Sequence, residues 1–415
     1  MLTDLRRKTG MESGGPRDRR AGVPSNAFGR SRFRDHTDPG PCPMIANFRA
    51  AVLTAPHEKL RIETLQAEAP RVGEVLVRIG AAGLCHTDLD VIQGQLVYPM
   101  PIVLGHEAAG TIAAGGPGVD PGRVGERVVL SWNPHCGRCF HCERGQPILC
   151  ERYVSQGPQA VAFDGTTRLS LAGQPVRTMM HIAAFAEYAV VTDACAIAIP
   201  PEMPLDRACL LGCGVLTGVG AATRIAALRY GDTAMVIGCG AVGLSAVQGA
   251  RLAGASRIMA VDLNDAKLAL ASDMGATHTV NARMSDPVAA VRAITGGRGA
   301  DCVLEAAGNE ASFRLSTEAC RLGGEIVWLG KVGVNQDVSF RWGALMGEKR
   351  ITRSSYGGAQ TATDFPALAR SYLRGELLLD GLITQRIALE EINRGFDDLK
   401  AGRTIRSVIM FGDAA

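Results

Sequence analysis

Ala234-Met-Val-Ile237 runs without a polar residue into Gly238-Cys-Gly240-Ala-Val-Gly243, and the stretch continues without a proline to Ala253. The unbroken apolar run predicts a strand buried on both faces, and the residues after the glycines predict a helix. In such a turn the first glycine permits the tight bend, the second lets a phosphate approach the backbone, and the third lets helix and strand pack closely. The free N–H groups of the helix N-terminus then face the phosphates. The stretch therefore predicts a phosphate-binding turn between a strand and a helix.

A second buried strand, Arg257-Ile-Met-Ala-Val261, follows and ends in Asp262. Three spaced glycines alone are weak evidence, but an acidic residue about twenty positions later is where a carboxylate binds the hydroxyls of an adenosine ribose. The two features together predict a dinucleotide site. Because its carboxylate repels a 2′-phosphate, Asp262 favours NAD over NADP. Lys267 either supports the same ribose or is a solvated lysine on a helix face, and the sequence leaves both open.

The pattern of strands and helices changes along the chain and divides it into parts. At 415 residues the chain exceeds what one hydrophobic core usually serves. Short strands broken by glycine and proline fill residues 44–217 and predict a β-barrel-like domain. Continuous apolar strands alternate with helices over 218–355 and predict a parallel sheet covered on both faces, whereas 356–415 returns to short mixed elements. The fold class is therefore α/β, a doubly wound sheet beside a β-barrel-like domain.

Residues 1–43 are rich in Arg, Gly and Pro and lack apolar periodicity, which predicts a disordered extension. A transit peptide is an alternative that the acidic residues of this stretch oppose, and a true start at Met44 is another. The net charge of +3 gives no case for binding nucleic acid or a membrane, and we find no apolar run long enough to span a bilayer. Cysteines without evident partners suit a reducing compartment, so we expect a cytoplasmic protein.

Four cysteines lie close together in the sequence, at Cys136, Cys139, Cys142 and Cys150. Repeated C-x-x-C spacing lets neighbouring thiolates face one centre, and four thiolates form a closed tetrahedral zinc site with no position left for a substrate. Disulfides, or cysteines that fill a core, are the alternatives, but the flanking glycines and charges do not suit a core. We therefore predict a structural zinc here and a catalytic centre elsewhere.

A second candidate metal site combines residues that are distant in the sequence. Cys85-His86-Thr87-Asp88 and Gly105-His106-Glu107 belong to the barrel-like part, and Cys213 stands between two glycines just before the dinucleotide half. A lone His or Cys is usually an ordinary buried residue. Cys, His and Cys together are the three-ligand set of a catalytic zinc with one open position, although spacing alone does not show that these three meet.

These motifs resemble those of the zinc-dependent medium-chain alcohol dehydrogenases, in the long-loop branch that includes the class I and class III dimers. The resemblance covers about Met44 to Phe411 and rests on motifs in the family's order: Gly83-Leu-Cys-His-Thr-Asp88, Gly105-His-Glu107, the four cysteines, Gly212-Cys-Gly214 with Thr217-Gly218, and Thr404-Ile-Arg-Ser-Val408. It implies a GroES-like catalytic domain at 44–217, a Rossmann NAD-binding domain at 218–355 and a C-terminal segment, 356–415, that completes the catalytic domain. It also implies two zinc ions, one catalytic and one structural, with the active site in the cleft between the domains.

The resemblance assigns roles around the catalytic zinc. The ion on Cys85, His106 and Cys213 takes the alcohol oxygen as its fourth ligand and acts as a Lewis acid. Thr87 accepts the alcohol's proton, and Asp88 orients the histidine ring. Other positions match further family sites: Glu107 assists ligand exchange or only balances charge, His86 and Arg406 match pyrophosphate contacts, and Thr217 and Val242 match nicotinamide contacts.

The chain departs from many relatives at Asp90, which stands where they carry a histidine that completes the proton path to solvent. A carboxylate can accept a proton, but its ordinary pKa lies below that of imidazole. The path therefore works through Asp90, ends in water, or bypasses this position.

Substrate-facing positions follow only from the resemblance: Trp132 matches an aromatic pocket wall, and Leu96, Val97 and Leu216 match an apolar cavity, although each is alternatively ordinary core. The acidic residues and the arginine that hold the thiol adduct in the formaldehyde-oxidising branch are missing at the positions that match Leu96 and Val154. We expect reversible hydride transfer between NAD and a primary alcohol, aromatic or allylic, giving the aldehyde. The alternatives are an S-(hydroxymethyl)glutathione dehydrogenase, a nicotinoprotein that keeps its NAD, and a non-catalytic NAD-binding relative.

The segment 155–184 is long, as in the dimeric branch that the chain resembles. We therefore expect a homodimer in which a strand near residues 326–329 pairs across the twofold axis. We expect a small-molecule substrate and neither a nucleic acid nor a membrane as partner.

Overall fold

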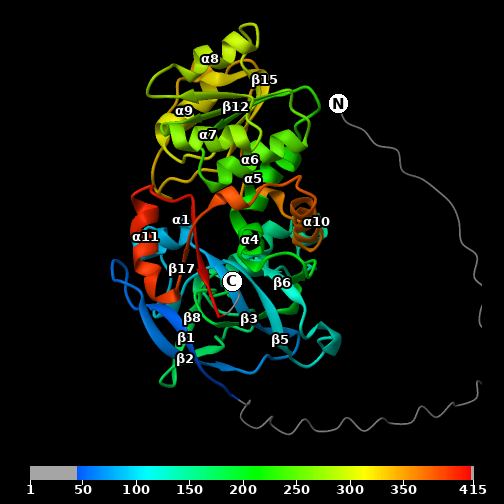
Figure 1. Cartoon of the computed structure of the whole chain (residues 1–415), viewed down its shortest axis with the longest axis vertical. Helices are drawn as coiled ribbons and strands as arrows, with labels where there is room; N and C mark the ends of the chain where they lie inside the picture. Colours follow the sequence, from blue (N-terminus) through cyan, green and yellow to red (C-terminus); the bar gives the residue numbers. More distant parts are fainter. Residues whose placement is uncertain (1–43, 413–415) are drawn as a thin grey trace, which may run out of the picture. The chain divides into compact units, whose positions relative to one another are not determined.

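The computed structural model describes residues 44–412, all within one compact unit of the chain, Cys42–Ala415. The extension predicted at 1–43 lies outside the described residues. Figure 1 follows the chain from the β-rich part (blue and cyan) into the second sheet (green and yellow) and back (red).

The first part of the chain forms the predicted β-barrel-like architecture. Its closed barrel has the strand order β1 (Met44–Leu53), β2 (Arg61–Glu68), β7 (Leu169–Leu171), β8 (Gln174–Thr178) and β4 (Ile102–Val103). A second sheet runs β10 (Ala196–Ala198), β6 (Arg127–Leu130), β5 (Glu107–Gly115), β3 (Glu74–Gly83), β18 (Arg406–Met410) and β17 (Ile383–Ile387), and β9 (Tyr188–Thr192) also pairs with β3. Strand β3 is buried along nearly its whole length, because Val77 and Ile79 pack in the core that includes the barrel strands, whereas Ala81 packs in the core around the helical residues 205–225.

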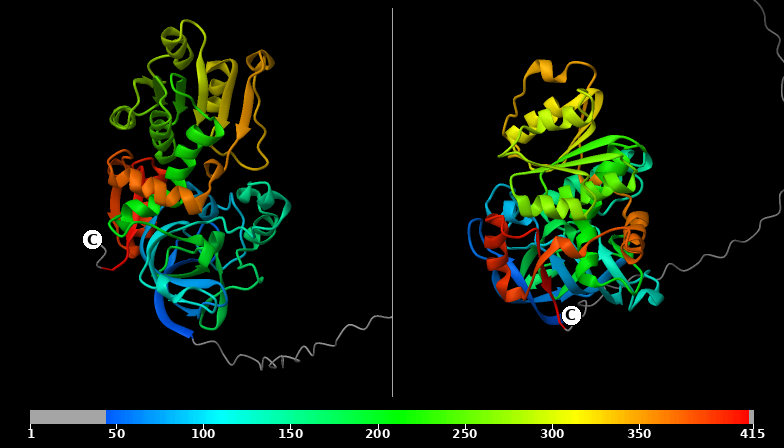
Figure 2. Two further views of the ribbon diagram at one scale, coloured as in Figure 1. Left: turned by 90° about the vertical axis from the view of Figure 1, so that its right-hand side faces the viewer. Right: turned by 45° about the horizontal axis from the view of Figure 1, so that its top comes forward.

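The last part of the chain returns to this sheet. Strand β18 pairs antiparallel with β3, and β17 pairs parallel with β18. Helix α11 (Ile392–Lys400) packs against β18, whereas α10 (Thr361–Leu373) packs against β10 and the helical residues 211–220. Figure 2 shows the red C-terminal strand beside the blue and cyan strands, so that the chain's last strand is interior to the sheet.

The second part is a six-stranded parallel sheet with the order β13 (His278–Asn281), β12 (Arg257–Asp262), β11 (Thr233–Ile237), β14 (Ala300–Glu305), β15 (Cys320–Trp328) and β16 (Arg350–Arg353). This order is that of a Rossmann fold. Residues on one face of the strands pack with helices α6 (Ala241–Leu252) and α7 (Asp265–Asp273), and those on the other face with α8 (Pro287–Ile294) and α9 (Glu310–Ala319). The predicted α/β class with a doubly wound sheet is confirmed.

One detail of the predicted dimer is wrong. Residues 326–328 belong to β15, which pairs with β14 on one side and with β16 on the other. A strand with both edges paired has no free N–H and C=O groups to offer to a second copy. The exposed edge on this side of the described sheet is β16.

A long helix links the two parts of the fold. It spans Leu205–Ile225 without interruption, with π-helical turns at Leu211–Val215 and Ala221–Ile225. Its length and mean hydropathy of 1.5 would suffice to cross a membrane, so our expectation that no such run exists is wrong, but 72% of that window is buried inside the fold. The helix packs against α6 so closely that a Cβ on Gly218 would lie 2.3 Å from the Val242 carbonyl oxygen.

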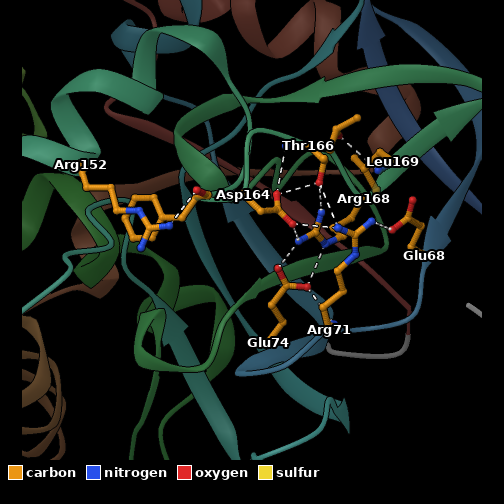
Figure 3. Close-up of polar contacts among 10 residues, drawn as sticks. Glu68, Arg71, Glu74, Arg152, Asp164, Thr166, Arg168 and Leu169 are labelled. Carbon is orange, nitrogen blue, oxygen red and sulfur yellow. Dashed lines mark hydrogen bonds and ion pairs between the residues drawn. The ribbon is translucent and has the colours of Figure 1, made fainter. Parts of the chain in front are cut away.

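A network of charges ties the long segment 155–184 to the barrel (Figure 3). The guanidinium of Arg168, which is only 5% exposed, donates to Glu74 Oε1 at 2.6 Å and to Asp164 Oδ2 at 2.7 Å. Arg71 donates to Asp164 at 2.8 Å and to Glu68 at 2.7 Å. Partial burial opposes ionisation of Asp164, but hydrogen bonds from Arg168 and Thr166 outweigh it and hold the pKa of that carboxyl below its usual range. The ionised network therefore fastens the segment to strands β2 and β3.

Candidate functional site

The four clustered cysteines meet in space. The Sγ atoms of Cys136, Cys139, Cys142 and Cys150 all lie within 4.8 Å of one another. A tetrahedral Zn²⁺ with Zn–S bonds of about 2.3 Å separates its sulfurs by about 3.8 Å, so the spacing suits the ion. Cys139 and Cys150 stand just before the short helices α2 (Phe140–Glu143) and α3 (Glu151–Gln156). The backbone N–H groups of Cys142 and Glu151 lower the pKa of Cys139 to about 6, which favours the thiolate that a zinc site requires.

A second metal-binding group forms from three distant parts of the chain. Cys85 precedes helix α1 (His86–Ile92), His106 precedes strand β5, and Cys213 lies in the π-helical turn of the long helix. Their ligand atoms, with a carboxylate oxygen of Glu107, lie within 4.8 Å of one another. A π-helical turn is a frequent device at functional sites, and here it presents Cys213 to the centre.

Asp88 holds His106 in a fixed orientation. Asp88 Oδ1 lies 3.1 Å from His106 Nδ1, and the carboxylate also accepts from the backbone N–H groups of Cys85 and Gly105. Burial alone would lower the pKa of His106, but the charges of Asp88 and Cys85 outweigh it and raise the pKa. His106 Nε2 is buried and has no hydrogen-bond partner among the described residues. This free nitrogen, beside two sulfurs, fits one cation with three protein ligands.

The sulfurs of Cys85 and Cys213 are close enough to share one proton. The hydrogen bond from Cys213, with the positive charges of Arg406 and His106, holds the pKa of Cys85 well below its ordinary value. Glu107 belongs to the same metal-binding group. Burial raises the pKa of its carboxyl to about 8, although the positive charge of Arg406 acts in the opposite direction. Arg406 is itself buried, with Nη2 3.1 Å from Glu107 Oε1 and 3.7 Å from Cys85 Sγ. Its guanidinium therefore engages the metal-binding group in this structure.

The glycine turn opens onto a cavity of about 780 Å³ at the carboxyl ends of β11 and β12. Gly238 has φ of +92°, a Cβ on Gly243 would lie 1.7 Å from the Gly238 carbonyl oxygen, and a Cβ on Gly240 would meet nothing within 4 Å. The first and third glycines are therefore required by the turn, whereas the second leaves open space where a phosphate can approach. The arrangement fits a dinucleotide.

Asp262 fastens this turn to the end of β12. Its carboxylate accepts from the backbone N–H groups of Cys239 at 2.7 Å, Leu263 at 2.7 Å and Asn264 at 3.0 Å. Asp262 and Lys267 both line the cavity. So do three residues that the sequence did not single out, Asn264, Arg283 and Asn309; Asn264 and Asn309 cap the N-termini of α7 and α9.

The other predicted cofactor contacts lie outside that cavity. His86 is exposed at the start of α1, and Thr87 is half-buried beside it. Thr217 and Val242 are half-buried where the long helix meets α6.

Aromatic side chains gather beside the second metal-binding group. The rings of Trp132 and Tyr356 stack with centroids 4.2 Å apart, and Tyr153 lies 6.2 Å from Trp132 and 5.6 Å from His181. The Tyr356 hydroxyl donates to the carbonyl oxygen of Gly212, the neighbour of Cys213, at 2.6 Å. Trp132 Nε1 and His181 Nε2 are buried without hydrogen-bond partners among the described residues. We call Trp132, Tyr153, His181 and Tyr356 the aromatic cluster; only Trp132 was identified from the sequence.

The predicted aliphatic pocket residues differ in their burial. Leu96 is partly buried beside the barrel core, and Val97 is 79% exposed. Leu216 is only 2% exposed and belongs to the core around the long helix.

Comparison with known proteins agrees with this geometry. Residues 71–201 match the family "Alcohol dehydrogenase GroES-like domain", and 241–373 match "Zinc-binding dehydrogenase". An S-(hydroxymethyl)glutathione dehydrogenase of Aspergillus oryzae is 37% identical over 364 residues, 87% of this chain and 95% of that protein. An alcohol dehydrogenase class-3 of Cereibacter sphaeroides is 36% identical over 373 residues, 88% of this chain and 99% of that protein.

Solved structures agree as well. A zinc-binding-domain alcohol dehydrogenase protein from Burkholderia ambifaria has a TM-score of 0.85 and 36% identity, covering 89% of this chain and 100% of that chain. A benzyl alcohol dehydrogenase from Acinetobacter calcoaceticus has a TM-score of 0.83 and 32% identity, covering 88% and 99%. The resemblance stated from the sequence motifs is thereby confirmed. The chain belongs to the zinc-binding medium-chain alcohol dehydrogenases, with a GroES-like and a Rossmann domain.

Proposed function

We propose that this protein is a zinc-dependent NAD alcohol dehydrogenase that interconverts a primary aromatic or allylic alcohol and its aldehyde. The observation that carries the proposal is the free, buried Nε2 of His106 beside the sulfurs of Cys85 and Cys213. When bound, zinc supplies a Lewis acid that favours the ionised alcohol, and NAD accepts the hydride.

The protein's own residues hold and orient these groups. Cys85, His106 and Cys213 bind the catalytic ion, and Asp88 fixes the tautomer and the plane of the histidine ring. Thr87 holds the reacting proton at its hydroxyl oxygen, near solvent. The four-cysteine cluster binds a second ion with all four positions filled, so it braces its lobe and takes no part in the reaction.

The nucleotide binds with its pyrophosphate at the glycine turn and its adenosine ribose at Asp262. The negative charge of Asp262 supports NAD as the cofactor, and Lys267 lies in the same cavity. His86, Arg406, Thr217 and Val242 complete the proposed set of cofactor contacts. A charge-balancing role for Glu107 is supported by its ion pair with Arg406.

The aromatic cluster supports the substrate class. Stacked rings beside Cys213 offer flat apolar surface to a benzylic or allylic group. The unpartnered Trp132 Nε1 and His181 Nε2 are further able to bind a polar substituent on that group. The solved relative named a benzyl alcohol dehydrogenase favours the same class.

Oxidation of S-(hydroxymethyl)glutathione is the second candidate, because several curated relatives carry that name. A glutathione adduct carries charged groups that need charged partners. Leu96 and the 60% exposed Val154 stand where such partners are expected from the resemblance. The apolar character of both positions favours a substrate without the tripeptide.

The test is NADH formation over benzylic, allylic, terpenoid and aliphatic alcohols, and over formaldehyde with and without glutathione. We expect saturable turnover of benzylic or allylic alcohols that is independent of glutathione. Turnover only of the glutathione adduct would replace the first candidate by the second. Stoichiometric bound nucleotide with no reduction of added NAD would indicate a nicotinoprotein, and no turnover with one zinc per chain would indicate a non-catalytic relative.

We further propose a cytoplasmic homodimer. Every described cysteine is free, which suits a reducing compartment. The edge strand β16 pairs with β15, which carries Leu322, and follows Trp342 and Met346 in the chain; these side chains are 70%, 79% and 63% exposed. Burial of these side chains against a second copy would remove an apolar surface from water. Light scattering after size exclusion tests this, and a monomer or tetramer would contradict it.

A further inference from the structure

A lysine from the Rossmann domain reaches the relay hydroxyl of the catalytic domain. Lys331 Nζ donates to Thr87 Oγ1 at 2.8 Å and lies 3.0 Å from Asp90 Oδ2. Thr87 and Asp90 are three residues apart on α1, so their side chains share one face of the helix. Asp88 points instead to His106. Helix α1 therefore serves the metal-binding group from one face and meets Lys331 with another.

The backbone of Lys331 is held firmly although its side chain is 45% exposed. Lys331 follows Gly330 in the loop after β15, and this loop packs against the loop after β14. A Cβ on Gly308 would lie 2.7 Å from the Lys331 nitrogen and oxygen, and a Cβ on Gly330 would lie 2.3 Å from the Gly308 nitrogen. Glu305 Oε1 accepts from the N–H groups of Ala307 and Gly308, both at 2.8 Å. These contacts fix the backbone from which the Lys331 side chain extends toward α1.

We propose that Lys331 is a positioning residue for Thr87, and that Asp90 holds its ammonium group in place. This rests on the proposed function, in which Thr87 receives the reacting proton. An ammonium group only donates, so it occupies one lone pair of Thr87 Oγ1; the second lone pair accepts the alcohol's proton, and the hydroxyl's own proton leaves toward solvent. The same positive charge favours the ionised alcohol on the far side of that hydroxyl.

The role also explains the departure at Asp90. A histidine there would be an uncharged or cationic neighbour of Lys331, whereas a carboxylate neutralises and anchors it. An exposed lysine–carboxylate pair without further purpose contributes almost nothing measurable to folding. If the pair were only structural, its mutation would leave activity unchanged. If it positions Thr87, its mutation should lower activity.

The test compares Lys331→Met, Lys331→Arg and Asp90→Asn with Lys59→Met, an exposed lysine in the loop before β2. We expect Lys331→Met to lower kcat for the best alcohol about tenfold with a smaller change in KM, as for loss of a charge-assisted hydrogen bond. Lys331→Arg should restore part of this loss, and Lys59→Met should match the wild type. In a double-mutant cycle the effects of Lys331→Met and Asp90→Asn should be far from additive.

A second readout needs no turnover. Hydrogen exchange of the backbone at 331–334 should be faster in Lys331→Met and Asp90→Asn than in the wild type, because the tie to α1 is lost. If the wild type is active and Lys331→Met has the same kcat, the role of Lys331 is overturned and the proposed function stands. An inactive wild type would overturn the proposed function, and unchanged exchange in both variants would overturn the tie itself.

Discussion

Asp88 Oδ1 lies 3.1 Å from His106 Nδ1, and the two side chains are almost completely buried. A buried carboxylate that faces a metal-bound imidazole fixes which nitrogen remains for the ion. The relationship shows how helix α1 and the start of β5 cooperate, since each contributes one half of the pair.

Replacement of this carboxylate should weaken the catalytic site. We expect Asp88→Asn to lower zinc affinity or activity by about 10- to 100-fold, because the amide cannot accept from Cys85 N–H, Gly105 N–H and the imidazole as the carboxylate does. Metal analysis after dialysis and kcat/KM measure the effect. Asp120→Asn, an exposed cap of a short turn, is the matched control and should behave as the wild type. Full zinc and full activity in Asp88→Asn would show that the ring is held by other means.

Mutations in the two metal-binding groups should have different effects on activity and stability. Cys213→Ser should lose most activity but keep one zinc per chain and a wild-type melting temperature, because the four-cysteine cluster remains whole. Cys142→Ser should instead lower the melting temperature, because the lobe loses its brace. Metal content, calorimetry and activity distinguish the cases. A Cys213→Ser variant that stays active would remove Cys213 from the catalytic ligands.

Cofactor choice should depend on the charge of Asp262. In Asp262→Asn the negative charge is lost while an acceptor remains for the backbone N–H groups of the turn. Lys267 and Arg283 line the same cavity, so their positive charges would then face a 2′-phosphate without opposition. We expect the ratio of kcat/KM for NADP to that for NAD to rise by about tenfold to a hundredfold. Asp273→Asn, exposed on α7, is the control, and an unchanged ratio in Asp262→Asn would place the ribose elsewhere.

The charge network around Arg168 should matter for folding more than any surface pair. Arg168→Met leaves the buried Glu74 carboxylate without its main partner, which should cost about 3–5 kcal/mol of unfolding free energy. Arg61→Met, whose pair with Glu58 is exposed, should cost about 0–1 kcal/mol. Urea unfolding measures both, and equal losses would contradict the buried character of the network.

The same network sets a direction for acid stability. The pKa of Asp164 is lowered in the folded protein, so its contribution is present above the unfolded pKa and is lost as the pH falls through the folded value. We expect the melting temperature of the wild type to fall in acid, and that of Asp164→Asn to fall less steeply. Parallel curves for the two proteins would show that Asp164 does not contribute.

The Rossmann domain could be predicted from the sequence, because unbroken apolar strands and the spacing of Gly238, Gly240 and Gly243 are local patterns. The four-cysteine cluster is equally local. Cys85, His106 and Cys213 required family resemblance, since only the folded chain brings β5 and the long helix to one point. Nothing local identifies Lys331, Tyr153 or Tyr356, because their roles arise from contacts between distant segments. The sequence did not identify Leu205–Ile225 as one long apolar helix, because its glycines interrupt the apolar pattern. The same glycines allow the helix to pack closely against α6.

That helix carries Cys213 on one turn and presses Gly218 against Val242 of α6 little more than one turn later. A metal ligand and the helix that begins at the glycine turn therefore belong to one rigid body. A displacement of α6 on nucleotide binding would be transmitted to a ligand sulfur with little loss. Zinc retention and nucleotide affinity should accordingly be thermodynamically linked, each changing the other by the same factor.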